Sequence, residues 1–188
     1  FLRSKVLQTL YARCVKGELD AAQARRAFDY NISRLNELGA LQLIALVKVV
    51  EAGRNVIEDG LKKMLPTEED LNPNYLIVDN PLMKILANHH DFQRINEKFV
   101  FPWDLHEDIF RDVYNRFRKS NRFKEYMRLE ERSCEDHQQM CLNMFKHLIN
   151  TPDFRELFAD RSLLWEDDFD QVAQYNFSQM KGADAYIF

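Results

Sequence analysis

The chain has 188 residues, enough for one large or two small domains with a sizeable core. Its content of 46% hydrophobic and 30% charged residues is typical of a soluble globular protein. The net charge of −4 excludes a basic field over the whole molecule, so nucleic-acid binding would require a local patch. The most apolar stretch, Leu41 to Val50, is too short to cross a bilayer. Three scattered cysteines, Cys14, Cys134 and Cys141, indicate reduced thiols, and we expect a cytoplasmic protein without a membrane partner.

The first predicted element, over residues 2–13, is a basic amphipathic helix that begins a stretch of sixteen residues without an acid. Its apolar line consists of Leu2, Val6, Leu10 and Cys14, with Leu7 and Tyr11 beside it. The opposite side carries Lys5, Gln8, Thr9, Ala12 and Lys16. Such a helix buries its apolar face in a bundle and offers its polar face to water, as most surface helices do, or to a polyanion. Arg3 falls by angle on the apolar side, which suits a first turn that projects beyond the core.

Helix signals continue to about residue 65. Gly17 is expected to close the first helix, and Asp20 with Gln23 resembles a capping box that opens the next. Gly39 either breaks the following helical pattern into two or only weakens it. Residues 66–80 contain two prolines and an acidic cluster and predict the one long loop, which the stretch 75–78 anchors to the core.

The remaining pattern is helical as well. Asn80 before Pro81 predicts an N-cap for a helix at 81–88, and Asp91 predicts the N-cap of another at 91–97. Asp104 and Glu107 resemble a further capping box, ahead of a buried stripe made of Ile109, Phe110, Val113 and Phe117. Further helices are expected at 120–130, 134–149, 153–160 and 166–180. With no convincing strand pattern, the predicted fold class is all-α, a multi-helix bundle.

Charge is unevenly distributed along the chain. Residues 111–132 are rich in Arg and Lys, whereas residues 153–170 are rich in Asp and Glu. Either the two segments face each other, or the basic one is an RNA or protein surface interleaved with Tyr114, Phe117, Phe123 and Tyr126. Solvated faces are the simpler interpretation, because the aromatic residues fall at core spacing and exposed charges cost little.

No pattern in the sequence indicates catalysis or a metal centre. Cys134, His137 and Cys141 share one helical face, but Met144 and Leu148 continue that face as a core stripe. No fourth ligand lies at the spacing of a structural zinc site. The acidic clusters at 68–70 and 166–168 have neither a partnering base nor a glycine-rich phosphate loop. We therefore expect a non-enzymatic protein without a cofactor or a bound metal.

Several segments of the sequence resemble one known family. The opening stretch Arg3 to Ala12 resembles the first helix of the NusB family of bacterial transcription antitermination factors, which typically reads basic residues followed by Val-x-Gln-x-Leu-Tyr. The runs Leu65 to Asn74 and Val78 to Asn80 are similar to the long, Bacteroidetes-type form of that family. The runs 124–127 and 165–168 also look like that form. Together these segments cover most of the chain.

This resemblance implies a specific function. Members of the family are all-helical and bind single-stranded boxA RNA together with the small-subunit ribosomal protein that acts as NusE, within an RNA polymerase antitermination complex. Carried over by position, Arg3 and Lys5 would meet phosphates, Gln8 would reach a base or a sugar, and Tyr11 would stack on a base or belong to the core. The alternative is a helical protein-interaction module with no role in RNA binding.

The resemblance also implies a division of the chain. Residues 1–65 would be the NusB-like N-terminal helices, 66–80 the loop, 81–181 an extended helical region, and 182–188 a truncated tail. The arginine-rich arm and the C-terminal half of the family are missing from this pattern, so the chain is interpreted as an N-terminal fragment. Self-association into a homo-oligomer is one way of covering the apolar surface that truncation exposes.

Overall fold

The computed structural model describes residues 2–17, 20–159 and 163–182, and in these residues the fold is all-α, as predicted. The helices are α1 (Leu2–Val15), α2 (Ala21–Leu61), α3 (Glu68–Leu71), α4 (Pro81–Asn88), α5 (His90–Lys98), the 3-10 turn η1 (Trp103–His106), α6 (Glu107–Phe117), α7 (Asn121–Arg128), α8 (Cys134–Ile149), α9 (Pro152–Ala159) and α10 (Leu163–Gly182). No helix of these residues is both long and apolar enough to cross a membrane. The predicted tail lies, from residue 183 onward, outside the described part.

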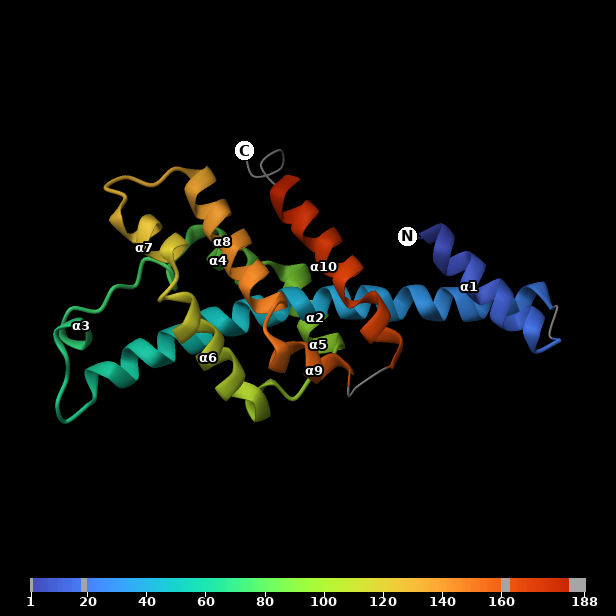
Figure 1. Cartoon of the computed structure of the whole chain (residues 1–188), viewed down its shortest axis with the longest axis horizontal. Coiled ribbons are helices and arrows are strands. Elements are labelled where there is room, and N and C mark those ends of the chain that lie inside the picture. Colours follow the sequence, from blue (N-terminus) through green and yellow to red (C-terminus); the bar gives the residue numbers. More distant parts are fainter. Residues whose placement is uncertain (1, 18–19, 160–162, 183–188) are drawn as a thin grey trace.

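Helix α2 is the axis of the molecule, and the other helices are arranged along it (Figure 1). Its 41 residues span about 60 Å at 1.5 Å per residue. It begins at the predicted N-cap, where the Asp20 carboxylate accepts a hydrogen bond from the Ala22 amide at 2.9 Å. Gly39 does not break it, because this glycine faces α10, where the Asn176 amide donates to the Gly39 carbonyl at 3.0 Å.

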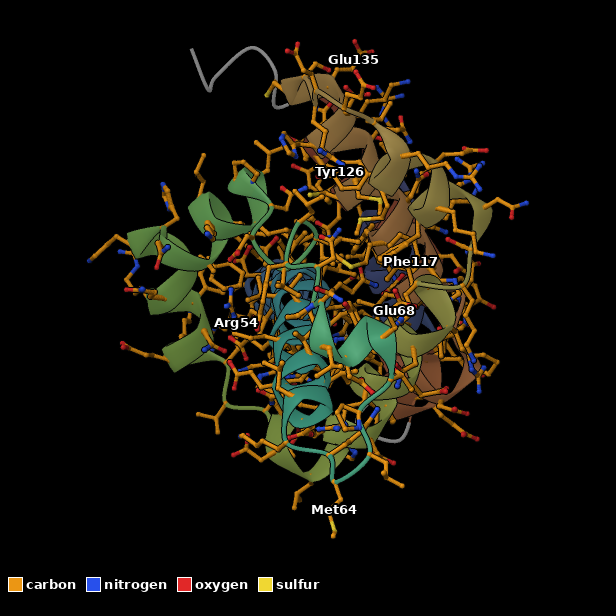
Figure 2. All side chains as sticks on the ribbon, turned by 90° about the vertical axis from the view of Figure 1, so that its left-hand side faces the viewer. Arg54, Met64, Glu68, Phe117, Tyr126 and Glu135 are labelled. Carbon is orange, nitrogen blue, oxygen red and sulfur yellow. The ribbon has the colours of Figure 1, made fainter. Side chains whose placement is uncertain are left out.

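One hydrophobic core joins the C-terminal two-thirds of α2 to α6, α8, α9 and α10. Figure 2 looks along α2 and shows helices on both sides of it, with Phe117 and Tyr126 among the elements on one side. The largest fully buried side chains include Trp165, Phe110, Phe154 and Phe158. Because core residues come from both of the predicted regions, 1–65 and 81–181, these two regions pack as one unit.

The connection between α2 and α4 follows the prediction in part. Ile77 and Val78 are buried and anchor it to the core, and the Asn80 side chain caps α4 by accepting from the Leu82 amide at 3.0 Å. Within the segment predicted as a loop, however, Thr67 and Asp70 form a capping box around the short helix α3. A single helical turn of this kind carries no apolar periodicity, so only its capping residues could have revealed it.

Several predicted helix starts are wrong, and the largest difference is at α10, which begins at Leu163 rather than at residue 166. Helix α5 begins at His90, one residue before the predicted cap at Asp91. The predicted capping box of Asp104 and Glu107 does not form, because residues 103–106 make a 3-10 turn and α6 begins at Glu107 without a side-chain cap. The buried Trp103 holds that turn against Phe101, whose ring centroid lies 4.2 Å away, so aromatic packing replaces the local cap.

Candidate nucleic-acid interface

Helix α1 packs against α2 with the opposite face from the one that its sequence indicates. It lies beside the N-terminal part of α2 (Figure 1). Thr9, from the predicted polar side, is buried, and its hydroxyl accepts a hydrogen bond from the Asn31 amide at 3.3 Å. The same hydroxyl donates to the Lys5 carbonyl at 2.8 Å. On α2, Asn31 and Arg34 lie beside this face of α1, so the polar side of α1 meets polar groups there.

The predicted apolar face of α1 therefore lies in solvent, which corrects the burial expected from the sequence. Val6, Leu10 and Cys14 are all exposed, although the periodicity placed them on the buried line. Leu7 and Tyr11 are 69% and 70% exposed. A contiguous apolar face on a surface helix is unusual in a monomer and is typical of a surface that meets a partner.

Lys5 is engaged within the protein. Its ammonium group lies 2.5 Å from an Asp168 carboxylate oxygen on α10, and the two side chains are only 13% and 8% exposed. A phosphate would have to displace this buried carboxylate before it reached Lys5. The pair ties α1 to α10 and explains one member of the acidic run 166–168 as structural.

Between α1, α2 and α10 lies a groove of about 410 Å³, which we call the α1 groove. Its wall includes Lys5 and Gln8 from α1, Lys16 directly after α1, and Arg34 from α2. Arg34 is paired with Glu37 and its guanidinium lies over the Trp165 ring, 4.4 Å from the ring centroid. Gln8 and Lys16, by contrast, are exposed at the edge of the groove.

The four residues predicted to contact RNA do not share one surface. Lys5 and Gln8 line the α1 groove, whereas Arg3 and Tyr11 are exposed but do not line it. At 100° per residue, Arg3 and Lys5 are about 160° apart around the helix axis. Arg3 and Tyr11 thus lie on the outward, apolar side of α1, whereas Gln8 lies at the edge of the α1 groove.

The Cys134, His137 and Cys141 set does not form a metal centre in the described residues, where no three His, Cys, Asp or Glu side chains gather around one point. His137 Nδ1 lies 2.8 Å from the Tyr126 hydroxyl, and burial lowers the pKa of this histidine. Cys141 is buried, and burial raises the pKa of its thiol to about 12. This face of α8 packs into the core together with Met144, as its continuation in the sequence indicates.

Arg111 of the basic segment 111–132 and Asp170 of the acidic segment 153–170 form ion pairs that do not link the two segments. Arg111 pairs with Asp59 of α2, at 2.6 Å, and with Glu107 of its own helix. In the acidic segment, Asp170 pairs with Arg155, at 2.6 Å between Arg155 Nη1 and Asp170 Oδ1. Other cations of the basic segment, namely Lys119, Lys124 and Arg128, are exposed to solvent.

Comparisons with known proteins do not identify the chain: no family model matches it, and neither a curated protein nor a solved structure matches it. Its function is therefore inferred from its residues and their arrangement.

Proposed function

We propose that this protein is a non-enzymatic, cytoplasmic, RNA-binding transcription antitermination factor of the NusB type. It would act on boxA-type leader RNA together with the ribosomal protein that serves as NusE, within an RNA polymerase antitermination complex. The proposal rests on the resemblance of residues 3–12 and 65–74 to that family. The observation that carries it is the outward face of α1, which holds an exposed Arg3 and an exposed Tyr11 beside exposed apolar side chains.

The chemistry of this face suits a single-stranded RNA with a protein partner. Recognition of a single strand needs cations for phosphates, planar groups for stacking and polar side chains for base edges. Arg3 and Tyr11 supply a cation and a planar group on this face, and Gln8 supplies a polar side chain from the neighbouring edge of the α1 groove, all within three turns of α1. The apolar residues Leu7 and Leu10 between them are suited to a protein surface rather than to RNA.

The test is fluorescence anisotropy with labelled boxA-like and scrambled single strands, at two salt concentrations. The test variant combines Arg3→Glu, Gln8→Ala and Tyr11→Ala. Lys5 is left unchanged, because its replacement would leave Asp168 buried without a partner. We expect binding that is weak, strongly dependent on salt and stronger for boxA, and we expect the variant to lose the boxA preference.

A matched control changes the same kinds of side chain on the exposed surface of α10, as Gln174→Ala, Tyr175→Ala and Lys181→Glu. This control is expected to keep the preference for boxA. Equal affinity of the wild-type protein for boxA and scrambled strands would contradict the proposal, and so would a loss of preference in the control alone.

The second candidate function is a helical protein-interaction module with no role in RNA binding. The specific observation in its favour is that Leu7, Leu10 and Val15 of α1 are more than half exposed. Sedimentation across a range of protein concentrations, with Leu7→Glu as the variant, tests whether a second copy covers this face. A partner interaction that is independent of salt and lost in Leu7→Glu, without any binding of RNA, would favour the second candidate.

A further inference from the structure

A second groove, larger than the first, lies at the other end of α2. It has a volume of about 940 Å³ and is bounded by the C-terminal end of α2, by α6 and α7, and by the segment around residues 70–74. We call it the α7 groove. Asn31 beside α1 and Ile57 in the wall of the α7 groove are about 40 Å apart along α2, so the two grooves are separate surfaces.

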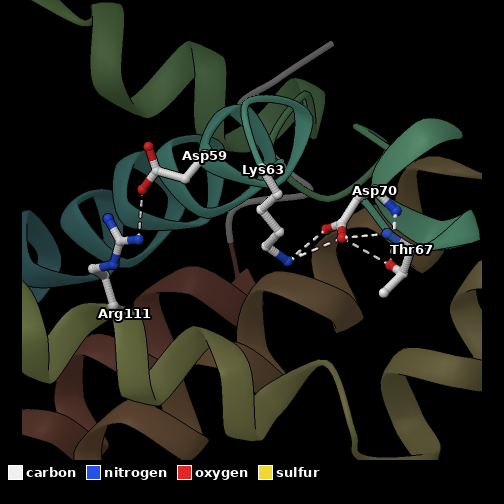
Figure 3. A network of polar contacts seen from close by, with 5 residues as sticks. All are labelled: Asp59, Lys63, Thr67, Asp70 and Arg111. Carbon is white, nitrogen blue, oxygen red and sulfur yellow. Dashed lines mark hydrogen bonds and ion pairs between the residues drawn. The ribbon is translucent and has the colours of Figure 1, made fainter. Parts of the chain in front are cut away.

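The acidic side chains in the wall of the α7 groove are already neutralised (Figure 3). Asp59 lies 2.6 Å from Arg111, and Asp70 lies 2.9 Å from Lys63. Asp70 also accepts hydrogen bonds from the Thr67 amide and hydroxyl at 2.9 and 2.8 Å. The pKa values of both carboxyls are lowered by these contacts, so each stays ionised and bound to its own cation. These acids therefore do not compensate the remaining cations.

Three further cations in the wall have no carboxylate partner among the described residues: Lys119, Lys124 and Arg128. All three are exposed. Lys124 and Arg128 are four residues apart and therefore lie on the same face of α7, where like charges repel. Lys119 precedes the N-terminus of the same helix. A polyanion would relieve this repulsion, and each phosphate that it contacts would release a counterion.

The rest of the groove favours a nucleic-acid strand over an acidic peptide. Phe123 is half-buried in the wall, and its ring packs edge-on against Phe117 with centroids 6.0 Å apart. A held aromatic ring of this kind is a stacking surface for a base. The Asn115 amide, also in the wall, has no hydrogen-bond partner among the described residues, and its donor and acceptor suit a base edge or a ribose hydroxyl.

We infer that the α7 groove binds single-stranded RNA, with Lys119, Lys124 and Arg128 on phosphates and Phe123 beneath a base. This inference rests on the proposed function for the identity of the partner, and it assigns that partner a second contact surface, at the far end of α2 from α1. A strand long enough to reach both surfaces would bind more tightly than either surface alone allows, because the second contact becomes intramolecular.

The test measures anisotropy of a labelled single-stranded RNA of about 12 nucleotides, a length within the usual site sizes. The groove variant is Lys119→Glu, Lys124→Glu and Arg128→Glu. The control variant makes the same change in net charge at exposed cations outside the groove, as Arg26→Glu, Lys146→Glu and Lys181→Glu.

The groove variant is expected to lose at least tenfold in affinity, while the control stays within about twofold of the wild type. The slope of log affinity against log salt should also fall by about 2 in the groove variant, because three phosphate contacts on a single strand contribute about 0.7 each. Ultraviolet cross-linking of a 4-thiouridine strand to the wild-type protein should map to α7. Phe123→Leu, which preserves the apolar packing, should weaken binding without changing that slope.

Wild-type affinity in the groove variant would overturn the inference, as would equal losses in both charge variants. The inference also fails if a poly-glutamate peptide competes for the groove while RNA does not. Failure of the proposed function looks different: RNA of either sequence would still bind in the α7 groove, but without any preference for boxA. Conversely, if the α1 variant abolishes the boxA preference and the groove variant binds normally, the proposed function stands and this inference does not.

Discussion

A close contact between Gly53 of α2 and Tyr114 of α6 predicts that one added methyl group will have a large effect on stability. Gly53 is buried in α2, and a Cβ atom built on it would lie 2.6 and 2.7 Å from two carbons of the Tyr114 ring. Tyr114 is itself only 3% exposed, so its ring has little room to move away. Gly53→Ala should therefore strain its contact with Tyr114, which lines the α7 groove.

A second glycine in the same helix makes the magnitude measurable. Gly39→Ala would place its Cβ 3.4 Å from Val172 and 3.6 Å from Asn176, which is ordinary packing distance. Each substitution gains about 1 kcal/mol of helix propensity, so this gain cancels when the two variants are compared. The difference that remains is the cost of overpacking at Gly53, about 1–3 kcal/mol.

The assay is chemical denaturation of both variants, supported by thermal melts. For a chain of this size, each kcal/mol corresponds to a change in Tm of roughly 2–4 °C. Gly39→Ala should be neutral or stabilising, and Gly53→Ala should be less stable than Gly39→Ala by the amount above. Adding Tyr114→Leu should recover part of the loss at Gly53, as a positive coupling in a double-mutant cycle. Equal stability of the two alanine variants would refute the reasoning.

Three other predictions concern charged groups and thiols. Lys5→Met should reduce the free energy of unfolding by about 1–3 kcal/mol, because Asp168 is left buried without its partner. Adding Asp168→Leu should restore most of the lost stability. No change in the free energy of unfolding of Lys5→Met would show that the pair contributes nothing. The carboxyl pKa of Asp70 is lowered from 3.8 to about 2 by hydrogen bonds from its capping residue and from a lysine, so its contribution to stability is complete above pH 4 and is lost as the pH falls toward 2. A carboxyl NMR titration should find a midpoint near 2, whereas a midpoint near 4 would mean that the capping box does not form. In a timed alkylation with iodoacetamide, the exposed Cys14 should react. Cys141 should not react, because it is buried and its thiol pKa is raised to about 12. Equal alkylation rates of the two thiols would contradict the burial of Cys141.

Local signals in the sequence determined most of the helices. Gly17 ends α1 with a positive φ of 71°, and Asn80 before Pro81 begins α4, both as predicted. The stripe of Phe110, Val113 and Phe117 is buried as its spacing indicates. These features depend on hydrogen bonds and on periodicity within a few residues, so the sequence alone contains the information. Where aromatic packing competes with a capping signal, as at Trp103 before α6, the capping signal fails.

The tertiary structure alone decided which face of α1 points inward and which cations are available. Periodicity shows that Val6 and Leu10 share a side, but the partner surface determines whether that side is buried. On α2, Asn31 is hydrogen-bonded to Thr9 on the other side of α1, and Val6 and Leu10 stay exposed. The predicted phosphate ligand Lys5 is likewise taken by Asp168, more than 160 residues away in the chain. The cations of α7 became a candidate site only when folding brought them beside the end of α2. In each case the deciding energy comes from a contact between residues distant in sequence, which no local pattern encodes.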